Sequence, residues 1–69
     1  MDFRITLAAA RVNAGLTQKQ AANKLKVSNK TLANWENGKA IPKADKIDAI
    51  CKLYCIAYDN IIFFTPKNA

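Results

Sequence analysis

The chain contains no histidine, and this absence rules out Ser-His and Cys-His nucleophile pairs and histidine-containing zinc sites. Its two cysteines, Cys51 and Cys55, are too few for a disulfide framework. No apolar run approaches the roughly 18 residues needed to span a bilayer, and the start Met1-Asp2-Phe3-Arg4 lacks the pattern of a secretory signal. We therefore expect a reduced, cytoplasmic protein that is not an enzyme and holds no metal or cofactor.

Acidic residues are also scarce, since five Asp and Glu stand against eleven Lys and Arg and the net charge is +6. A net positive charge of this size in a small domain favours a polyanionic partner, either nucleic acid or an anionic membrane surface. The 51% hydrophobic and 23% charged content is ordinary for a globular domain. A chain of 69 residues has room for one domain. We assign residues 1–65 to it and residues 66–69 to a short C-terminal tail.

Glycine and proline occur only twice each, and they fall where elements change. The first helix is expected over Phe3–Asn13, with Gly15 in the left-handed conformation after its last turn. Thr17 and Gln20 have the spacing of a capping box, which predicts the start of a second helix. Ala21, Ala22 and Leu25 lie on one face of that helix.

Three further helices are predicted after the second one. Ser28 is a good N-cap for the third, in which Leu32 and Trp35 share a core-facing side and Asn37-Gly38 marks the end. Pro42 suits the first position of a fourth helix that continues to Tyr54. A short fifth helix is expected from Tyr58 to Phe63. The aromatic residues expected in the core are Tyr54, Tyr58, Phe63 and Phe64. No segment alternates as a strand should, so the expected fold is all-α with five compact helices.

The second and third helices, each about eight residues long and joined by a short turn, have the dimensions of a helix-turn-helix, whose second helix fits the DNA major groove. At this point the sequence resembles the Cro and phage-repressor (Xre-type, lambda-repressor-like) DNA-binding domain. The resemblance is carried by Leu16–Ala22 and Val27–Lys39, above all by the string Trp35-Glu36-Asn37-Gly38-Lys39 followed by Pro42. It extends over about Phe3 to Phe63.

The resemblance implies a set of DNA-contacting residues. Base contacts are expected at the start of the second helix and along the third, from Gln18, Ser28, Asn29, Lys30 and Asn34. Phosphate contacts are expected from Gln18, Lys19, Thr31, Asn37, Lys39 and Lys43. Arg11 and Glu36 match a structural ion pair, in which the arginine would offset the repulsion between phosphate and the chain's one glutamate.

Independently of the resemblance, the chemistry of these side chains is compatible with DNA contact. Asn can pair bidentately with adenine, Lys can donate to guanine, and the amide groups at a helix N-terminus suit a phosphate. The competing interpretation is that the same residues form an ordinary solvated helix face. Lys24, Lys26, Lys46, Lys52 and Lys67 are assigned to solubility. Lys26 departs from the family pattern, because Gly with positive φ is usual at that position of the turn.

The leading hypothesis is a sequence-specific double-stranded DNA-binding transcriptional regulator of prophage or mobile-element type, which reads the major groove with its third helix. Its expected partner is an inverted-repeat operator bound by a homodimer, with no membrane association and no small-molecule ligand. The alternative is an antitoxin-like or adaptor module that contacts a partner protein through Ile61–Phe64. RNA is a poor target, because the A-form major groove is too narrow for a recognition helix.

Overall fold

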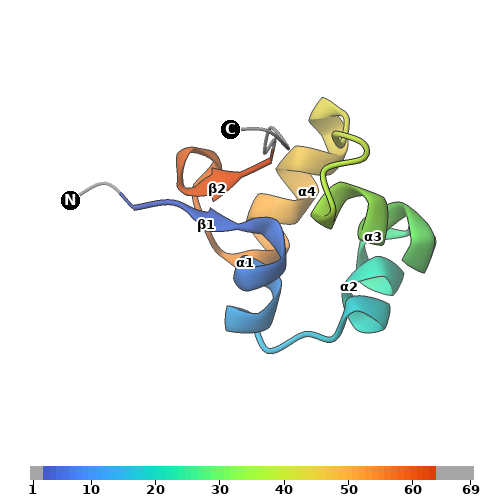
Figure 1. Cartoon of the computed structure of the whole chain (residues 1–69). Helices are drawn as coiled ribbons and strands as arrows, with labels where there is room; N and C mark the ends of the chain where they lie inside the picture. The colour runs from blue at the N-terminus through green and yellow to red at the C-terminus, as the bar shows by residue number, and fades with distance from the viewer. Residues whose placement is uncertain (1–2, 64–69) are drawn as a thin grey trace.

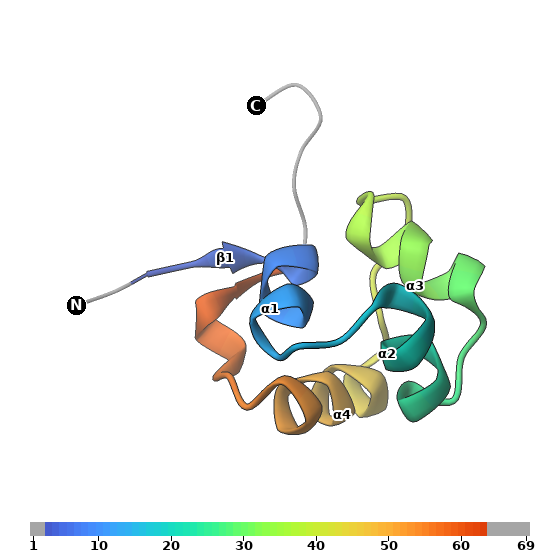
Figure 2. The same cartoon turned by 90° about the horizontal axis from the view of Figure 1, so that it is seen from below.

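The computed structural model describes residues 3–63 of the chain. In order, the elements are β1 (Ile5–Thr6), α1 (Leu7–Asn13), α2 (Gln18–Leu25), α3 (Asn29–Glu36), α4 (Ala44–Tyr54), a 3-10 turn (Tyr58–Asn60) and β2 (Ile61–Ile62). Figures 1 and 2 show α2 and α3 together at one end of the molecule and β1 at the other, with α1 and α4 between them. None of the helices in the described part is long and apolar enough to cross a membrane.

The prediction of five helices without strands is wrong at both ends of the chain. The first helix begins only at Leu7, because Thr6 is its N-cap and accepts a hydrogen bond of 3.1 Å from the Ala9 N–H. Residues expected in its first turn are instead extended, and β1 pairs in parallel with β2 in the register Ile5 to Ile61. The expected fifth helix is a single 3-10 turn followed by β2. β-Branched residues favour extended backbone where they find a partner strand.

The start of the fourth helix was also predicted wrongly. Pro42 is buried in the loop before α4, and Lys43 is an extended N-cap with ψ 166°. The loop turns back on the end of α3, since the N–H groups of Lys39 and Ala40 both donate to the carbonyl of Asn34. Pro42 therefore packs in this loop and lies two residues ahead of the first helical residue.

The start signals of α2 and α3 and the glycines that follow α1 and α3 are confirmed. Thr17 and Gln20 form the capping box through hydrogen bonds of 3.1 and 2.9 Å. Ser28 caps α3 by accepting from the Thr31 N–H at 3.0 Å. Gly15 and Gly38 both have φ of +77°, which a residue with a Cβ rarely adopts. Each of these features depends on residues at most four apart, so the sequence alone was sufficient to predict them.

The core joins all four helices and β2. Its buried residues include Leu32 and Trp35, as predicted; the full set is Leu7, Ala10, Ala21, Ala22, Leu25, Leu32, Trp35, Ile50, Tyr54 and Ile61. Tyr58 was expected in the core but is 58% exposed, and its ring stacks on Phe63 at a centroid distance of 5.4 Å. The expectations for Phe64 and for the tail at 66–69 fall outside the described residues.

Lys26 adopts the left-handed conformation, with φ 61° and ψ 42°, at the C-cap of α2. We predict that Lys26→Gly raises the free energy of unfolding by about 0.5–1 kcal/mol, because glycine carries no Cβ penalty there. Lys24→Gly, inside the same helix, should instead lower it by about 1 kcal/mol. Thermal unfolding of both variants checks this, and a loss of stability in Lys26→Gly would show that the turn is unstrained.

Candidate nucleic-acid interface

The turn between α2 and α3 is fixed by backbone and side-chain hydrogen bonds. The Val27 N–H donates to the carbonyl of Ala22 at 3.0 Å, which closes the end of α2. Lys46, on α4, reaches across and donates from Nζ to the carbonyl of Leu25 at 2.9 Å. An ammonium at a helix C-terminus also interacts favourably with the helix dipole. α4 is thus joined to the C-terminal end of α2, next to the turn.

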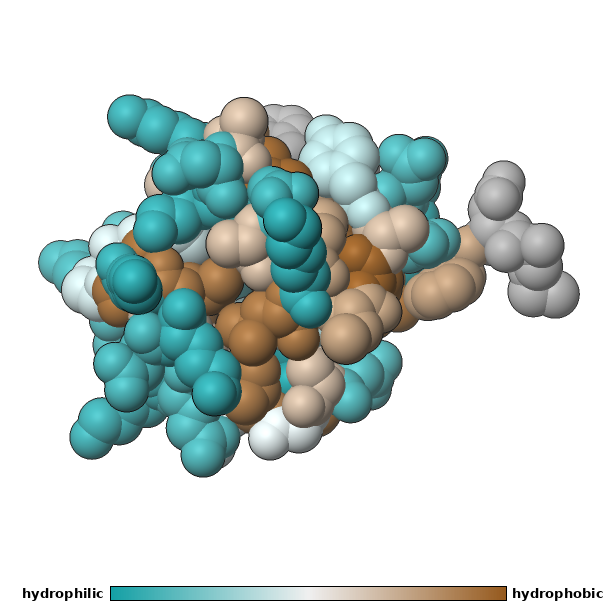
Figure 3. Space-filling view, turned by 180° about the vertical axis from the view of Figure 1, so that it is seen from behind, coloured by the Kyte–Doolittle hydropathy of each residue, from teal (hydrophilic) through white to brown (hydrophobic). Residues whose placement is uncertain are grey.

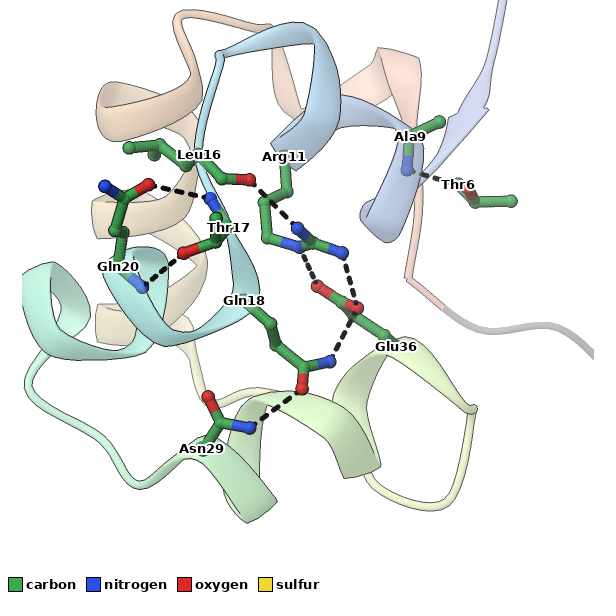
Figure 4. Close-up of polar contacts among 9 residues, drawn as sticks. All are labelled: Thr6, Ala9, Arg11, Leu16, Thr17, Gln18, Gln20, Asn29 and Glu36. Carbon is green, nitrogen blue, oxygen red and sulfur yellow. Dashed lines mark hydrogen bonds and ion pairs between the residues drawn. The ribbon is translucent and has the colours of Figure 1, made fainter.

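A mostly buried ion pair connects α1 to α3. Nε of Arg11 lies 2.8 Å from Oε2 of Glu36, and the two side chains are only 15% and 7% exposed. Arg11 also donates from Nη1 to the carbonyl of Leu16 at 2.9 Å and from Nη2 to Oε1 of Glu36 at 3.5 Å. The arginine therefore fixes α1, the loop before α2 and the last residue of α3 relative to one another (Figure 4).

From Glu36 the network continues outward to the first residues of α2 and α3. Nε2 of Gln18 donates to Oε1 of Glu36 at 3.0 Å, and Oε1 of Gln18 accepts from Nδ2 of Asn29 at 2.9 Å (Figure 4). A carboxylate only accepts hydrogen bonds, so the Gln18 amide must turn its NH₂ group inward and its oxygen toward Asn29. This in turn points the NH₂ group of Asn29 at Gln18 and leaves Oδ1 of Asn29 available.

The structure brings the expected base-contacting residues together at one end of the molecule. Gln18 and Asn34 are half-buried, while Ser28, Asn29 and Lys30 are exposed. Ser28 also has a structural role, because its hydroxyl caps α3 and donates to the hydroxyl of Thr31 at 2.8 Å. Gln18 and Asn29 were expected to contact bases, and in the structure their side chains also form a hydrogen bond with each other.

The expected phosphate-contacting residues lie on α2, on α3 and in the loop that follows α3. Lys19 follows Gln18 on α2, and Asn37, Lys39 and Lys43 lie beyond the end of α3; all four are exposed, and Thr31 is half-buried. The ion pairs within residues 3–63 are Arg11 with Glu36 and Lys52 with Asp48, so Lys19, Lys30, Lys39 and Lys43 have no acidic partner there. Viewed from behind, hydrophilic side chains gather over the end of the molecule that carries α2 and α3 (Figure 3).

Two features of this region were missed by the sequence reasoning. Lys46 was assigned to solubility, yet it bonds to Leu25, and no local pattern links residues 21 positions apart. The hydrogen bond between Gln18 and Asn29 was not anticipated either, although both residues were named as DNA contacts. As for metals, the residues described place no group of three Cys, Asp or Glu close enough together to hold an ion.

A helix-turn-helix family model matches residues 7–54 of the chain. The chain is 38% identical over 62 residues to the HTH-type transcriptional regulator ImmR of Bacillus subtilis, covering 90% of this chain and 49% of the relative. It is 32% identical over 62 residues to the HTH-type transcriptional activator BcrR of Enterococcus faecalis, covering 90% of this chain and 30% of that protein. It thus spans less than half the length of each relative. No solved structure matches it significantly.

Breaking the ion pair should be costly because the remaining charge stays largely buried. We predict that Arg11→Met lowers the free energy of unfolding by about 2–4 kcal/mol, and that adding Glu36→Gln restores part of this loss. Lys52→Met is the matched control, since it breaks the ion pair with Asp48 in which both side chains are more than 60% exposed. That change should cost at most about 0.5 kcal/mol. Equal losses in Arg11→Met and Lys52→Met in denaturant melts would contradict the assignment.

The raised pKa of the Tyr54 phenol predicts that the folded chain loses stability at high pH. Burial, with a smaller contribution from the charge of Glu36, raises the pKa of Tyr54 to about 12 from its ordinary 10.0, and Arg11 opposes this shift. The protonated phenol therefore stabilises the folded chain fully below pH 10. This contribution to the free energy of unfolding is lost as pH rises toward 12, because the unfolded chain releases the proton first. The total loss is about 1–3 kcal/mol. Denaturant melts from pH 9 to 12 should show it in the native chain but not in Tyr54→Phe.

Proposed function

The chain belongs to the Cro- and phage-repressor-type helix-turn-helix family, and from this premise we propose that it is a sequence-specific, double-stranded DNA-binding transcriptional regulator. In this proposal α3 enters the major groove and the protein is of prophage or mobile-element type, as the resemblance to phage repressors implies. The two curated relatives carry the names of a transcriptional activator and a transcriptional regulator, which supports this class of function.

The observation that carries the proposal is the pair of linked amides at the starts of α2 and α3. Gln18 and Asn29 are held by a 2.9 Å hydrogen bond and anchored inward on Glu36. An amide with a fixed orientation presents its donor and acceptor in a defined order, which is what reading a base edge requires. In the proposal, Asn29, Lys30, Asn34 and Ser28 contact bases together with Gln18.

Phosphate contacts fix the protein's register on the duplex and contribute most of the salt-dependent affinity. We assign these contacts to the exposed Lys19, Lys39, Lys43 and Asn37, with Thr31 and the N-terminus of α2 at Gln18. The ion pair matters here as well. Arg11 offsets the charge of Glu36, the one acidic residue on α3, which would otherwise repel the DNA backbone.

The proposed partner is an inverted-repeat operator bound by two copies of the chain. Two copies on one face of the duplex would place their α3 helices in half-sites about 34 Å apart, one helical turn. The adaptor alternative relied on an exposed Ile61–Phe64 segment. Among its described residues, Ile61 is 5% exposed and Ile62 and Phe63 are half-buried, while the nearby Tyr58 is 58% exposed.

Selection of bound duplexes from a random DNA pool, at two salt concentrations, tests the proposed function. We expect an enriched inverted repeat that survives the higher salt, because base contacts do not depend on counterion release. A single enriched half-site would retain the sequence specificity and contradict the dimer. Binding that disappears with salt and enriches no sequence would reject the proposed function.

Base and phosphate contacts should separate in two lysine variants. Lys30→Ala should relax the preference at one base position, costing about 1–3 kcal/mol on the preferred operator. Lys39→Ala should weaken all sequences similarly and reduce the slope of log K against log salt by about one. Lys52→Ala, on α4 beside Asp48, is the control and should change neither quantity. If Lys30→Ala and Lys39→Ala alter specificity equally, this division of roles is wrong.

A further inference from the structure

An apolar groove lies along the outward side of α4. It has a volume of about 520 Å³ and is lined by Ala44, Ile47, Asp48 and Cys51 of α4 and by residues 56–58, which follow the helix. The four α4 residues have the spacing i, i+3, i+4 and i+7, so they share one face of the helix. α4 lies at the rear in the view of Figure 1, and Figure 3 shows hydrophobic side chains in the middle of that rear face.

The groove presents apolar surface that residues 3–63 leave uncovered. α4 buries Ile50 and Tyr54 in the core, whereas Ile47 and Cys51 on the adjoining face are only half-buried. Tyr58, which also lines the groove, is 58% exposed. A hollow of this volume is in the range that proteins use to hold ligands, and covering it removes apolar surface from water, which is favourable. The groove is therefore a candidate docking surface.

The groove is also bordered by acidic side chains. Every aspartate in residues 3–63 belongs to α4 or to the 3-10 turn after it: Asp48 lines the groove, and Asp45 and Asp59 are exposed. Lysine and arginine show the opposite distribution, since all of them within residues 3–63 precede α4 except Lys46 and Lys52. Lys46 is directed toward α2 by its hydrogen bond, and Lys52 pairs with Asp48 at 3.1 Å. The chain is thus basic over the helix-turn-helix and net acidic around the groove.

This charge distribution determines which partner the groove suits. DNA and acidic proteins would be repelled by the carboxylates. A second copy docked groove to groove is also disfavoured, because a twofold interface brings the same patch together from both sides and like charges would meet. An amphipathic helix with lysine or arginine flanking its apolar face matches both the hollow and the carboxylates around it.

We propose that the groove between α4 and residues 56–58 docks a basic amphipathic helix of a partner protein. The α4 face from Ala44 to Cys51 is about 10 Å long, or about two helical turns. In the docked state the partner's apolar side chains cover Ile47, and its cations lie against Asp48 and Asp45. Because the groove is lined by residues outside α2 and α3, a partner could bind there while the helix-turn-helix contacts DNA. The proposal goes beyond the proposed function and does not depend on it.

The first test measures binding of a synthetic peptide to the native chain. The probe is a labelled, helix-forming peptide of about four turns, with leucine at i, i+3, i+4 and i+7 and with lysine and alanine elsewhere. The control peptide has glutamate in place of every lysine. At about 0.15 M salt, we expect the lysine peptide to bind saturably and roughly tenfold tighter than the glutamate peptide, although the net charge of +6 favours the latter at long range. Equal affinities, tighter binding of the glutamate peptide or no saturable binding of the lysine peptide would overturn the proposal.

The second test locates the peptide with two pairs of variants. Ile47→Ser should weaken the lysine peptide by roughly tenfold, because it removes apolar surface from the groove. Val12→Ser is its matched control, since Val12 lies on α1 and is 62% exposed, and it should bind like the native chain. Asp48→Asn should weaken binding about two- to fivefold. Asn13→Lys, on α1, changes the net charge by the same amount and should have a smaller effect.

Thermal unfolding shows whether each variant is folded. If Ile47→Ser folds poorly, Asp48→Asn decides the question, because the Asp48 side chain is 67% exposed and its replacement leaves the core intact. Equal weakening by Asp48→Asn and Asn13→Lys would mean that the peptide responds to net charge alone, and would overturn the proposal.

A third measurement separates a partner protein from a second copy and from DNA. In sedimentation without peptide, Ile47→Ser should have the same oligomeric state as the native chain. Loss of a native dimer in that variant would assign the groove to a contact between copies and overturn the proposal. Asp48→Asn should bind DNA as the native chain does, and loss of DNA binding in the folded variant would also overturn it. If the native chain binds no DNA sequence selectively, the proposed function fails, and the peptide measurements still decide the role of the groove.

Discussion

The structure depends on one carboxylate. Glu36 is the only glutamate in a chain of net charge +6, and it lies 2.8 Å from Arg11 with little exposure to solvent. Through the arginine it connects to α1 and to the Leu16 carbonyl, and through Gln18 it connects to α2 and Asn29. A buried charge needs compensating partners, so α1, the start of α2 and α3 are held in one arrangement around it.

This arrangement explains how a domain with so few residues presents an ordered polar surface. Side-chain amides on an exposed helix would normally sample several rotamers, and ordering them on binding reduces affinity. Here the ordering takes place during folding, because Gln18 can satisfy Glu36 in only one orientation of its amide. An apolar pair in place of Arg11 and Glu36 could match the stability of the ion pair, but it would leave Gln18 without an anchor. The main effect of the ion pair is therefore to fix the orientation of Gln18 rather than to stabilise the fold.

The parts of the fold that the sequence predicted are those encoded by neighbouring residues. The capping box at Thr17, the Ser28 cap and the turn glycines each follow from side chains within a few positions of the helix end. The strand pair could not be predicted in this way, since Ile5 meets Ile61 across 56 positions and each strand is two residues long. Such a short strand has no measurable alternation, and its stability comes from the partner rather than from its own pattern.

The same division applies to the surface around α3. The resemblance to phage repressors nominated Gln18, Asn29 and Lys30, and helical periodicity placed Asn29 and Lys30 on the outward side of their own helix. The orientation of the Gln18 and Asn29 amides was not predictable, since it depends on Glu36, which Arg11 contacts from 25 positions earlier in the chain. Helix geometry thus determines which side chains of the motif lie outward, and the network that begins at Arg11 on α1 determines which atoms Gln18 and Asn29 present.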